Sequence, residues 1–227
     1  DIVAEPWCNL ARQAQETLEE DVLYLAWRAR KKTRAKNLCL AGGAALNCII
    51  NRKIMESGLF RDLFIQPAAS DEGIPLGAAL HGYYGSGGEV RWHMEHAYLG
   101  SDPGAPDLDD LVGTWKLASA PAGPEDVAKL LASGAIIGRM DGGSEYGPRA
   151  LGNRSILADP RAPDMKTRIN GTIKHREGFR PFAPSCLADA PPEFFDTPSN
   201  SPFMIVAGHG APSHRDRPRS STGRGAS

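Results

Sequence analysis

The sequence predicts an α/β fold built in two parts, with a mainly parallel sheet in the first part. Between residues 14 and 85 the patterns run helix, strand, glycine turn, helix, strand, loop and helix. This alternation is typical of parallel strands joined by helices. Residues 85–123 then lose regular periodicity and become rich in Gly, Pro and Asp, which predicts a linker before a second helix and strand.

The first part supplies the alternating elements. Residues 14–35 place apolar side chains at helical spacing and end in the basic run RARKKTRAK, which suits the negative end of a helix. A buried strand stopped by two glycines follows, then a helix closed by glycine, a second strand, and a loop that enters a third helix. In sequence order these are NLCLAGG (37–43), AALNCIINRKIMESG (44–58), LFRDLFIQP (59–67) and SDEGIPLGAALHGYYG (70–85).

The second part begins with a helix over PEDVAKLLASG (124–134), with Pro near its first turn, and a buried strand over AIIGRM (135–140). After a basic segment, RPFAPSCLAD (180–189) predicts a further strand and PPEFFD (191–196) predicts a turn. From about residue 208 the chain is rich in Gly, Ser, Pro and Arg and has almost no large apolar side chain. This tail is expected to be disordered.

Composition argues against several classes of function. The 227 residues carry 26 basic and 27 acidic side chains, and the net charge of -1 argues against a general nucleic-acid binder. The four cysteines form no CxxC pair, which favours free thiols in a reducing compartment, here the cytoplasm, over a structural zinc site. No apolar run approaches the roughly 18 residues of a membrane span. The chain opens at Asp1 without Met, so a fragment of a longer protein is expected.

The strongest local signal is EYGPRALGNRSILADPR (145–161), because it interleaves arginines with glycines and apolar residues. From Arg149 to Arg180 there are eight basic and three acidic residues, a surplus of five. The turn at Gly147 and Pro148 can project Arg149 from a rigid backbone, and a guanidinium matches phosphate oxygens two at a time. Such a cation contributes about 1 kcal/mol against a phosphate in water and about 4 kcal/mol at an effective dielectric near 20, so a pocket for an anion is predicted. A surface network of salt bridges with the three acids remains the alternative.

Two further positions lie where α/β sheets place their ligands. Gly42, Gly43 and Asn47 follow the first strand and open a helix, where free amides and the helix dipole suit a phosphate. A glycine turn that only packs helix on sheet is the alternative. Asp71 follows the second strand in a loop of small residues, as a metal ligand or as a helix N-cap. A metal role would need partners from outside this chain.

The motifs themselves carry a resemblance. GPRALGNRSILADPR followed by INGTIKHREGFRPFAPS closely resembles the C-terminal domain of the O-carbamoyltransferases, which carbamoylate hydroxyl groups on antibiotics and nodulation oligosaccharides. LAGGAALNCIINRKI and LFIQPAASDEGIPLGAAL resemble the end of that family's N-terminal domain. The resemblance runs from about Leu10 to Met204. It implies an α/β chain with the C-terminal half of an actin-like, sugar-kinase-like ATPase domain (1–100), a linker (101–122), an incomplete YrdC-like domain (123–206) and a disordered tail (207–227).

The resemblance implies a two-step reaction. The YrdC-like domain joins carbamoyl phosphate to ATP, which magnesium accompanies, releases pyrophosphate and forms a carbamoyl adenylate. The actin-like domain binds this intermediate and an iron-type divalent metal, and passes the carbamoyl group to a hydroxyl of a small-molecule acceptor, as in antibiotic biosynthesis. No nucleic acid and no membrane is implied. By position in the motifs, catalytic and phosphate-binding roles fall to Arg149, Lys174 and Arg180, further phosphate binding to Arg154, adenylate binding to Gly42, Gly43 and Asn47, and metal ligation to Asp71.

Two departures from the family pattern are expected to matter. The family's paired metal-binding histidines, a His-x-x-x-His motif, lie upstream of this chain, so Asp71 lacks its partners here. After SPFM the family continues into a Thr-His-x-Asp-Gly-Thr segment, whereas this chain reads IVAGHGAPSHRDRPRSSTGRGAS, as a shifted reading frame in a GC-rich gene would give. Two other interpretations stay open. One is an inactive remnant that only binds nucleotide; the other is a tRNA threonylcarbamoyl-type enzyme, against which the near-neutral charge argues.

Overall fold

The computed structural model of the chain describes residues 3–102, 104, 107–187, 195–196 and 201–210, and divides it into two compact units. Unit 1 comprises residues 3–94 together with the described residues from 185 to 210. Unit 2 comprises the described residues between 95 and 184. The first unit is therefore assembled from two stretches of chain that lie far apart in the sequence.

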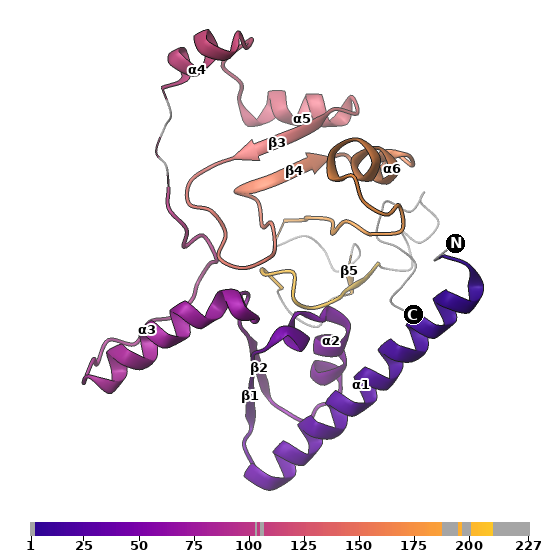
Figure 1. Ribbon diagram of the computed structural model, residues 1–227, viewed down its shortest axis with the longest axis vertical. Coiled ribbons are helices and arrows are strands. Elements are labelled where there is room, and N and C mark those ends of the chain that lie inside the picture. The colour runs from indigo at the N-terminus through magenta and orange to yellow at the C-terminus, as the bar shows by residue number, and fades with distance from the viewer. Residues whose placement is uncertain (1–2, 103, 105–106, 188–194, 197–200, 211–227) are drawn as a thin grey trace. The chain divides into compact units, whose positions relative to one another are not determined.

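Unit 1 is a mixed helix and strand structure (Figure 1). Its elements are α1 (Glu5–Thr33), β1 (Asn37–Leu40), the 3-10 helix η1 (Gly43–Leu46), α2 (Cys48–Glu56), β2 (Asp62–Ile65), the 3-10 helix η2 (Asp71–Gly73), α3 (Ile74–Gly85), β5 (Phe195–Asp196) and β6 (His209–Gly210). Strands β1 and β2 pair in parallel, from Asn37 opposite Asp62 to Leu40 opposite Ile65. The predicted parallel pairing of the first two strands is confirmed. Strands β5 and β6 form a separate antiparallel pair.

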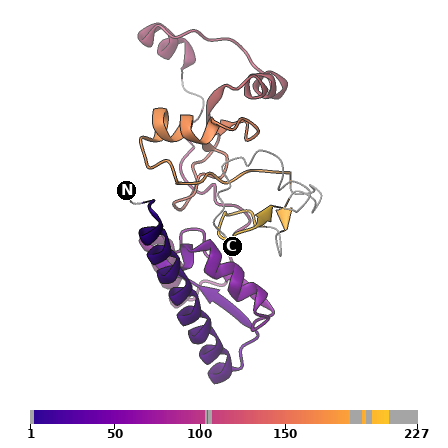
Figure 2. The ribbon, with the colours of Figure 1, turned by 90° about the vertical axis from the view of Figure 1, so that its right-hand side faces the viewer.

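Helix α1 is longer than predicted and lies along α2 (Figures 1 and 2). It begins at Glu5, since Pro6 suits a first helical turn, and it ends before Arg34, which adopts a left-handed conformation with φ of 57°. A buried carboxylate on α1, Glu19, forms an ion pair with Lys53 on α2. Burial acts to raise the pKa of Glu19, but the hydrogen bonds from Lys53 and from Gln15, on the turn before it, hold this pKa below the ordinary value.

The core of unit 1 includes a segment from the far end of the chain. Ala45, Ile65, Ala69 and Ile205 form one buried cluster. Leu40, Leu46, Leu63, Phe203 and Val206 pack against this cluster. Apolar residues from 203–206, which the expected boundaries assigned to the second domain, thus pack with Leu40 and Ile65 at the carboxyl ends of β1 and β2.

Unit 2 is organised around an antiparallel hairpin (Figure 1). Its elements are α4 (Leu108–Trp115), α5 (Pro124–Ala132), β3 (Ile136–Met140), β4 (Arg154–Ala158), α6 (Met165–Ile169) and the short π-helix η3 (Asn170–Lys174). Strand β3 pairs with β4 from Ile136 opposite Ala158 to Met140 opposite Arg154. The hairpin is closed by the long loop 141–153. This loop carries Arg149 and the first part of the segment 145–161, here called the arginine motif.

Several local predictions are corrected. The described part of the predicted strand 180–189, residues 180–187, contains no strand, because Pro181 and Pro184 have no amide to donate to a sheet. The expected linker contains helix α4, which Asp107 caps by accepting from the Asp110 amide at 3.0 Å. The predicted turn at 191–196 ends in strand β5, and its other residues lie outside the described ones.

The expected disordered tail falls mostly outside the described residues. Of 207–227, the structure describes 207–210. Ala207 donates its amide to the Cys48 carbonyl at 3.1 Å, and His209–Gly210 pairs with β5. All four cysteines are free thiols, as predicted. In the portion of the chain that the structure describes, no helix has the combination of length and apolar character needed to cross a membrane.

Candidate functional site

The first group of expected site residues meets at one edge of the parallel sheet in unit 1. Strands β1 and β2 run in the same direction, so the turn at Gly42 and the loop before Asp71 both leave from the carboxyl edge. Gly42 has φ of 98°, and its amide donates to the Ala69 carbonyl at 2.6 Å. This contact joins the glycine turn to the loop after β2. The glycine turn and the loop before Asp71 thus lie at the same edge of the sheet, as the sequence predicted.

Gly73, which was not singled out from the sequence, restricts the conformation of this loop. A side-chain carbon on Gly73 would lie 2.0 Å from the carbonyl oxygen of Ala68. No larger residue fits there without a shift of the backbone. Gly73 therefore fixes the position from which η2 presents Asp71, whose side chain is exposed.

Asn47 has a structural role. Its Oδ1 accepts from the amides of Ile49 and Ile50, each at 3.2 Å, and thereby caps α2. Its Nδ2 donates to Gln15 on α1 at 2.9 Å. The side chain thus ties α1 to the start of α2.

The described residues do not assemble a metal centre. Within residues 3–102, 104, 107–187, 195–196 and 201–210, no three His, Cys, Asp or Glu side chains come close enough to hold a metal ion together. Asp71 is one exposed carboxylate, and a divalent cation in a protein site takes several such donors. The residues present do not by themselves fit the expected iron-type metal.

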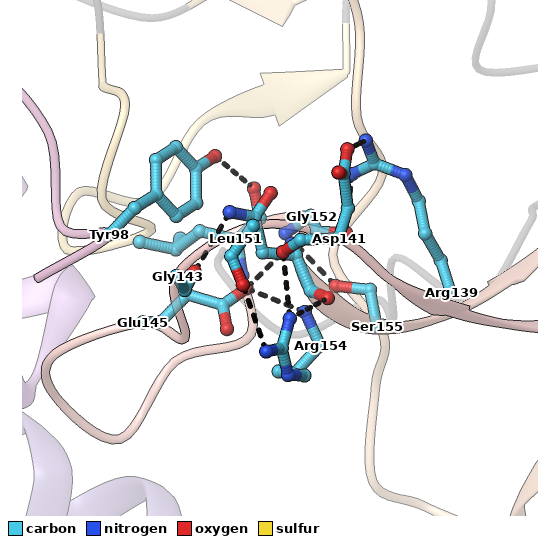
Figure 3. Close-up of polar contacts among 11 residues, drawn as sticks. Tyr98, Arg139, Asp141, Gly143, Glu145, Leu151, Gly152, Arg154 and Ser155 are labelled. Carbon is cyan, nitrogen blue, oxygen red and sulfur yellow. Dashed lines mark hydrogen bonds and ion pairs between the residues drawn. The ribbon is translucent and has the colours of Figure 1, made fainter. Parts of the chain in front are cut away.

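The arginine motif in unit 2 folds around an acidic side chain (Figure 3). Glu145 Oε1 accepts hydrogen bonds from the amides of Leu151 at 2.8 Å, Asn153 at 2.9 Å and Arg154 at 3.2 Å. Burial acts to raise the pKa of Glu145, but these amides together with its own lower it, so that the net pKa lies below the ordinary value. The carboxylate is held in its charged form inside the loop.

Arg154 braces the same loop (Figure 3). Its guanidinium donates from Nη1 to the Asp141 carbonyl at 2.7 Å and the Asn153 carbonyl at 3.0 Å, and from Nη2 to the Gly142 carbonyl at 2.9 Å. A guanidinium has five N–H donors, and carbonyls of the described residues engage three of those of Arg154.

Contacts from outside the loop hold it on both sides. The Tyr98 hydroxyl donates to the Leu151 carbonyl at 2.8 Å, and the Tyr146 amide donates to the Ala97 carbonyl at 2.6 Å. Arg139 of β3 donates to the Gly152 carbonyl at 2.7 Å and forms an ion pair with Asp141. This frame gives Arg149 a fixed backbone, and its side chain is half-buried.

The other two expected cations lie on a second segment of unit 2. Lys174 ends η3 and is exposed. Arg180 is also exposed and its Nε lies 2.7 Å from Glu177 Oε2. The backbone amide of Glu177 and the charge of Arg180 lower the pKa of this carboxyl. For Arg180 the structure therefore displays the ion pairing that the alternative interpretation described.

Asn170 and Arg176 organise that second segment and were missed by the sequence analysis. Asn170 is 1% exposed; its Oδ1 accepts from Arg176 Nε at 2.8 Å and its Nδ2 donates to the Arg180 carbonyl at 3.1 Å. The guanidinium of Arg176 also lies 4.6 Å from the ring centre of Phe182. The sequence carried one available signal, an Asn between apolar residues of a helical pattern, since such a side chain needs partners when buried.

Comparison with known proteins identifies the family. Residues 4–80 match the carbamoyltransferase N-terminus and residues 128–222 match the carbamoyltransferase C-terminus. The second match extends into the tail for which a shifted reading frame was expected. Both matches include the segments on which the resemblance was based.

Individual relatives agree with this. Nodulation protein NolO of Bradyrhizobium diazoefficiens is 44% identical over 205 residues, covering 86% of this chain and 37% of that protein. Nodulation protein NolNO of Sinorhizobium fredii is 43% identical, over 86% of this chain and 30% of that protein. Nodulation protein U of Azorhizobium caulinodans is 36% identical, over 90% of this chain and 34% of that protein.

The chain spans about a third of the length of these curated relatives. The part that it spans matches both the N-terminal and the C-terminal domains of one family, in the order that the family has them. The chain belongs to the carbamoyltransferase family.

Proposed function

We propose that this chain is part of an enzyme that converts carbamoyl phosphate and ATP into a carbamoyl adenylate and passes the carbamoyl group to a hydroxyl of a small-molecule acceptor. The loop of residues 141–154, here called the arginine loop, carries the proposal. It lies within the match to the carbamoyltransferase C-terminus, and it presents a half-buried guanidinium, Arg149, from a backbone fixed by hydrogen bonds on both sides. A cation fixed in this way suits a phosphorylated substrate.

Charge neutralisation and positioning are the proposed roles of the basic side chains. Carbamoyl phosphate, ATP and one water give carbamoyl adenylate, pyrophosphate and phosphate, so charge on phosphoryl oxygens has to be stabilised throughout the step. Arg149 would bind a phosphate in two-pronged fashion, and Arg154, Lys174 and Arg180 would supply further positive charge. In the second step the acceptor hydroxyl attacks the carbamoyl carbon, loses its proton and displaces AMP.

The proposed role of unit 1 is to receive the adenylate. We assign unit 1 to the end of the actin-like domain and unit 2 to the YrdC-like domain of the family. Support in unit 1 comes from the turn at Gly42 and Gly43, which has no side chain to keep a phosphate from the backbone, although the Gly42 amide already donates to the Ala69 carbonyl. Asp71 at the same sheet edge supplies one carboxylate, and no step is assigned to a metal through it.

The acceptor is proposed by class alone. The relatives are named as nodulation proteins, and members of the resembled family act on antibiotics and nodulation oligosaccharides. A hydroxyl of such a secondary metabolite or oligosaccharide is therefore the acceptor to test. Cytoplasmic localisation fits these substrates and remains part of the proposal.

Pyrophosphate release tests the first step. The chain with ATP and carbamoyl phosphate is expected to release pyrophosphate above the rate with ATP alone, and Lys174→Ala is expected to reduce that rate. Threonine with bicarbonate in place of carbamoyl phosphate is the control for a threonylcarbamoyl-type enzyme. Release only with threonine and bicarbonate would overturn the proposal.

A binding-only function is a second candidate, because the chain spans about a third of its relatives. Isothermal titration with carbamoyl phosphate and with ATP, in parallel with the pyrophosphate assay, separates the two. Heat of binding without pyrophosphate release favours the binding-only chain. Release of pyrophosphate excludes it.

A further inference from the structure

The backbone of the arginine loop forms a site for an anion, and the loop fills this site itself. The amides of Leu151, Asn153 and Arg154 all donate to one oxygen of Glu145, at 2.8, 2.9 and 3.2 Å. The remaining amide of this run, Gly152, donates to Ser155 Oγ at 2.9 Å. Each of the four consecutive amides from 151 to 154 thus has an acceptor inside the loop.

Converging backbone amides of this kind commonly bind phosphate in other proteins. Here Gly152 has φ of 128°, a conformation that suits glycine and lets the neighbouring amides turn toward one point. The point is occupied by a carboxylate from six to nine residues upstream. A substrate phosphate would have to displace Glu145 to reach these amides.

We propose that Glu145 is a positioning residue that serves as the internal anion of the arginine loop and leaves the substrate phosphate to the side chain of Arg149. This inference rests on the proposed function. Glu145 and Arg149 are separated by three residues, of which Gly147 has φ of 116° and Pro148 has a fixed φ. Anchoring Glu145 in the amides therefore also anchors the turn from which Arg149 projects.

The side-chain frame favours a permanent anchor over a displaceable one. Asn153 Nδ2 donates to the Gly143 carbonyl at 2.9 Å, and Arg154 donates to the carbonyls of Asp141 and Gly142. Residues 141–143, which precede Glu145, are thereby tied to Asn153 and Arg154, two of the residues whose amides Glu145 accepts from. Release of the carboxylate would leave three amides without acceptors inside a hydrogen-bonded loop, which is unfavourable.

The test follows the amides of residues 151, 153 and 154 by NMR in the 227-residue chain. In the wild type these amides are expected to exchange slowly and to keep their shifts while inorganic phosphate or carbamoyl phosphate is added. In Glu145→Ala their exchange is expected to speed up by about tenfold or more, and the dissociation constant for carbamoyl phosphate to rise by about tenfold. Acetate, added as a substitute carboxylate, is expected to restore protection in Glu145→Ala and to leave the wild type unchanged.

Two variants make the result specific. Glu145→Gln keeps the volume of the side chain and one acceptor oxygen but removes the charge, so it covers the case in which the alanine variant does not fold; it is expected to reduce protection of the same three amides, by less than Glu145→Ala does. Glu125→Gln removes an exposed carboxylate from the first turn of α5 in the same unit and is expected to match the wild type.

The inference is overturned if phosphate shifts the three amides in the wild type, which would make them the substrate site, or if both Glu145 variants keep wild-type protection and affinity. A wild type that binds no carbamoyl phosphate contradicts the proposed function of this chain. In that case the amide protection and the acetate arm still decide the role of Glu145.

Discussion

The side-chain amide of Asn51 donates to the backbone carbonyl of Ile205 at 2.7 Å, across 154 positions of sequence. The same Nδ2 donates to the Ala45 carbonyl at 2.8 Å, in the 3-10 helix that follows the glycine turn. Asn51 is fully buried. One side chain thus connects residue 205 to the segment proposed to receive the adenylate.

Loss of the Ile205 side chain is expected to destabilise unit 1. Ile205 is 7% exposed and contacts the buried cluster that includes Ile65 and Ala69. Ile205→Ala is therefore expected to lower the free energy of unfolding by about 2–5 kcal/mol. Ile173→Ala, at a position 41% exposed, is the matched control and is expected to cost about 0.5 kcal/mol or less. Urea unfolding followed by circular dichroism measures both; equal effects of the two would contradict the packing role of residue 205.

Substitution of Gly73 is expected to disturb the loop that carries Asp71. The carbon added in Gly73→Ala would lie 2.0 Å from the Ala68 carbonyl oxygen, and a backbone atom cannot move aside as a flexible side chain can. A loss of about 1–3 kcal/mol is expected in urea unfolding. Gly77→Ala, in α3, meets no atom within 4 Å and is expected to raise stability by about 0.5–1 kcal/mol. A Gly73→Ala protein as stable as Gly77→Ala would show that the contact at Ala68 is unimportant.

The sequence patterns predicted what depends on local spacing. The strands β1 and β2, the glycine turn after β1 and the placement of Asp71 follow from alternating apolar segments and turn residues, and the parallel pairing follows from the helix between them. The strand β4 was missed because Arg154 and Ser155 lie in it next to Gly152, so its apolar residues looked like part of a loop.

Other features depend on contacts that no local pattern encodes. Glu145 accepts hydrogen bonds from three backbone amides. The sequence could not predict these bonds, because every residue except proline has the same backbone donor. The sequence did indicate that a negative charge would lie against the arginine segment, and one such charge is supplied by the segment itself. The contact of Ile205 with the cluster that contains Ala45 joins residues more than a hundred positions apart in the sequence, so no local pattern predicts it.

Acidification is expected to weaken unit 2 through Glu145. Burial acts to raise the pKa of Glu145. The hydrogen bonds from the amides of Leu151, Arg154 and Asn153 lower it by more than burial raises it, so the pKa in the folded chain lies below the ordinary value of 4.5. The unfolded chain then binds the proton more readily, and the stabilisation is complete above the unfolded pKa and is lost as the pH falls through the folded one. Asp159, whose pKa is lowered by Arg161, acts with the same sign.

Glu145→Gln measures this contribution. Urea unfolding between about pH 6 and pH 3 is expected to give a smaller decline in stability for Glu145→Gln than for the wild type, because the variant has no carboxylate to protonate at this position. The variant is also expected to be less stable than the wild type at pH 7. Parallel pH profiles for the two proteins would be inconsistent with a charged Glu145 in the loop.

Arg149 is expected to bind the substrate phosphate more strongly than Arg161, an exposed arginine of the same segment. Arg149 is half-buried, whereas the side chain of Arg161 is 77% exposed and its Nε lies 2.9 Å from Asp159 Oδ1. Arg149→Ala is expected to weaken carbamoyl phosphate binding by about 1–4 kcal/mol, the range from a cation in water to one in a half-buried pocket. Arg161→Ala removes the same charge and is expected to weaken binding much less, because an exposed charge is screened by solvent.

Salt separates a pocket from a general field of positive charge. Screening over about 10 Å at 0.1 M salt weakens exposed charges most, so the difference between the two arginine variants is expected to persist as salt is raised to 0.5 M in titration calorimetry. If Arg149→Ala and Arg161→Ala lose affinity equally, and high salt abolishes both losses, binding depends on the summed charge of the segment. The fixed backbone on both sides of Arg149 favours a difference between the two variants that persists at high salt. A guanidinium on such a backbone loses little conformational freedom when it binds a phosphate.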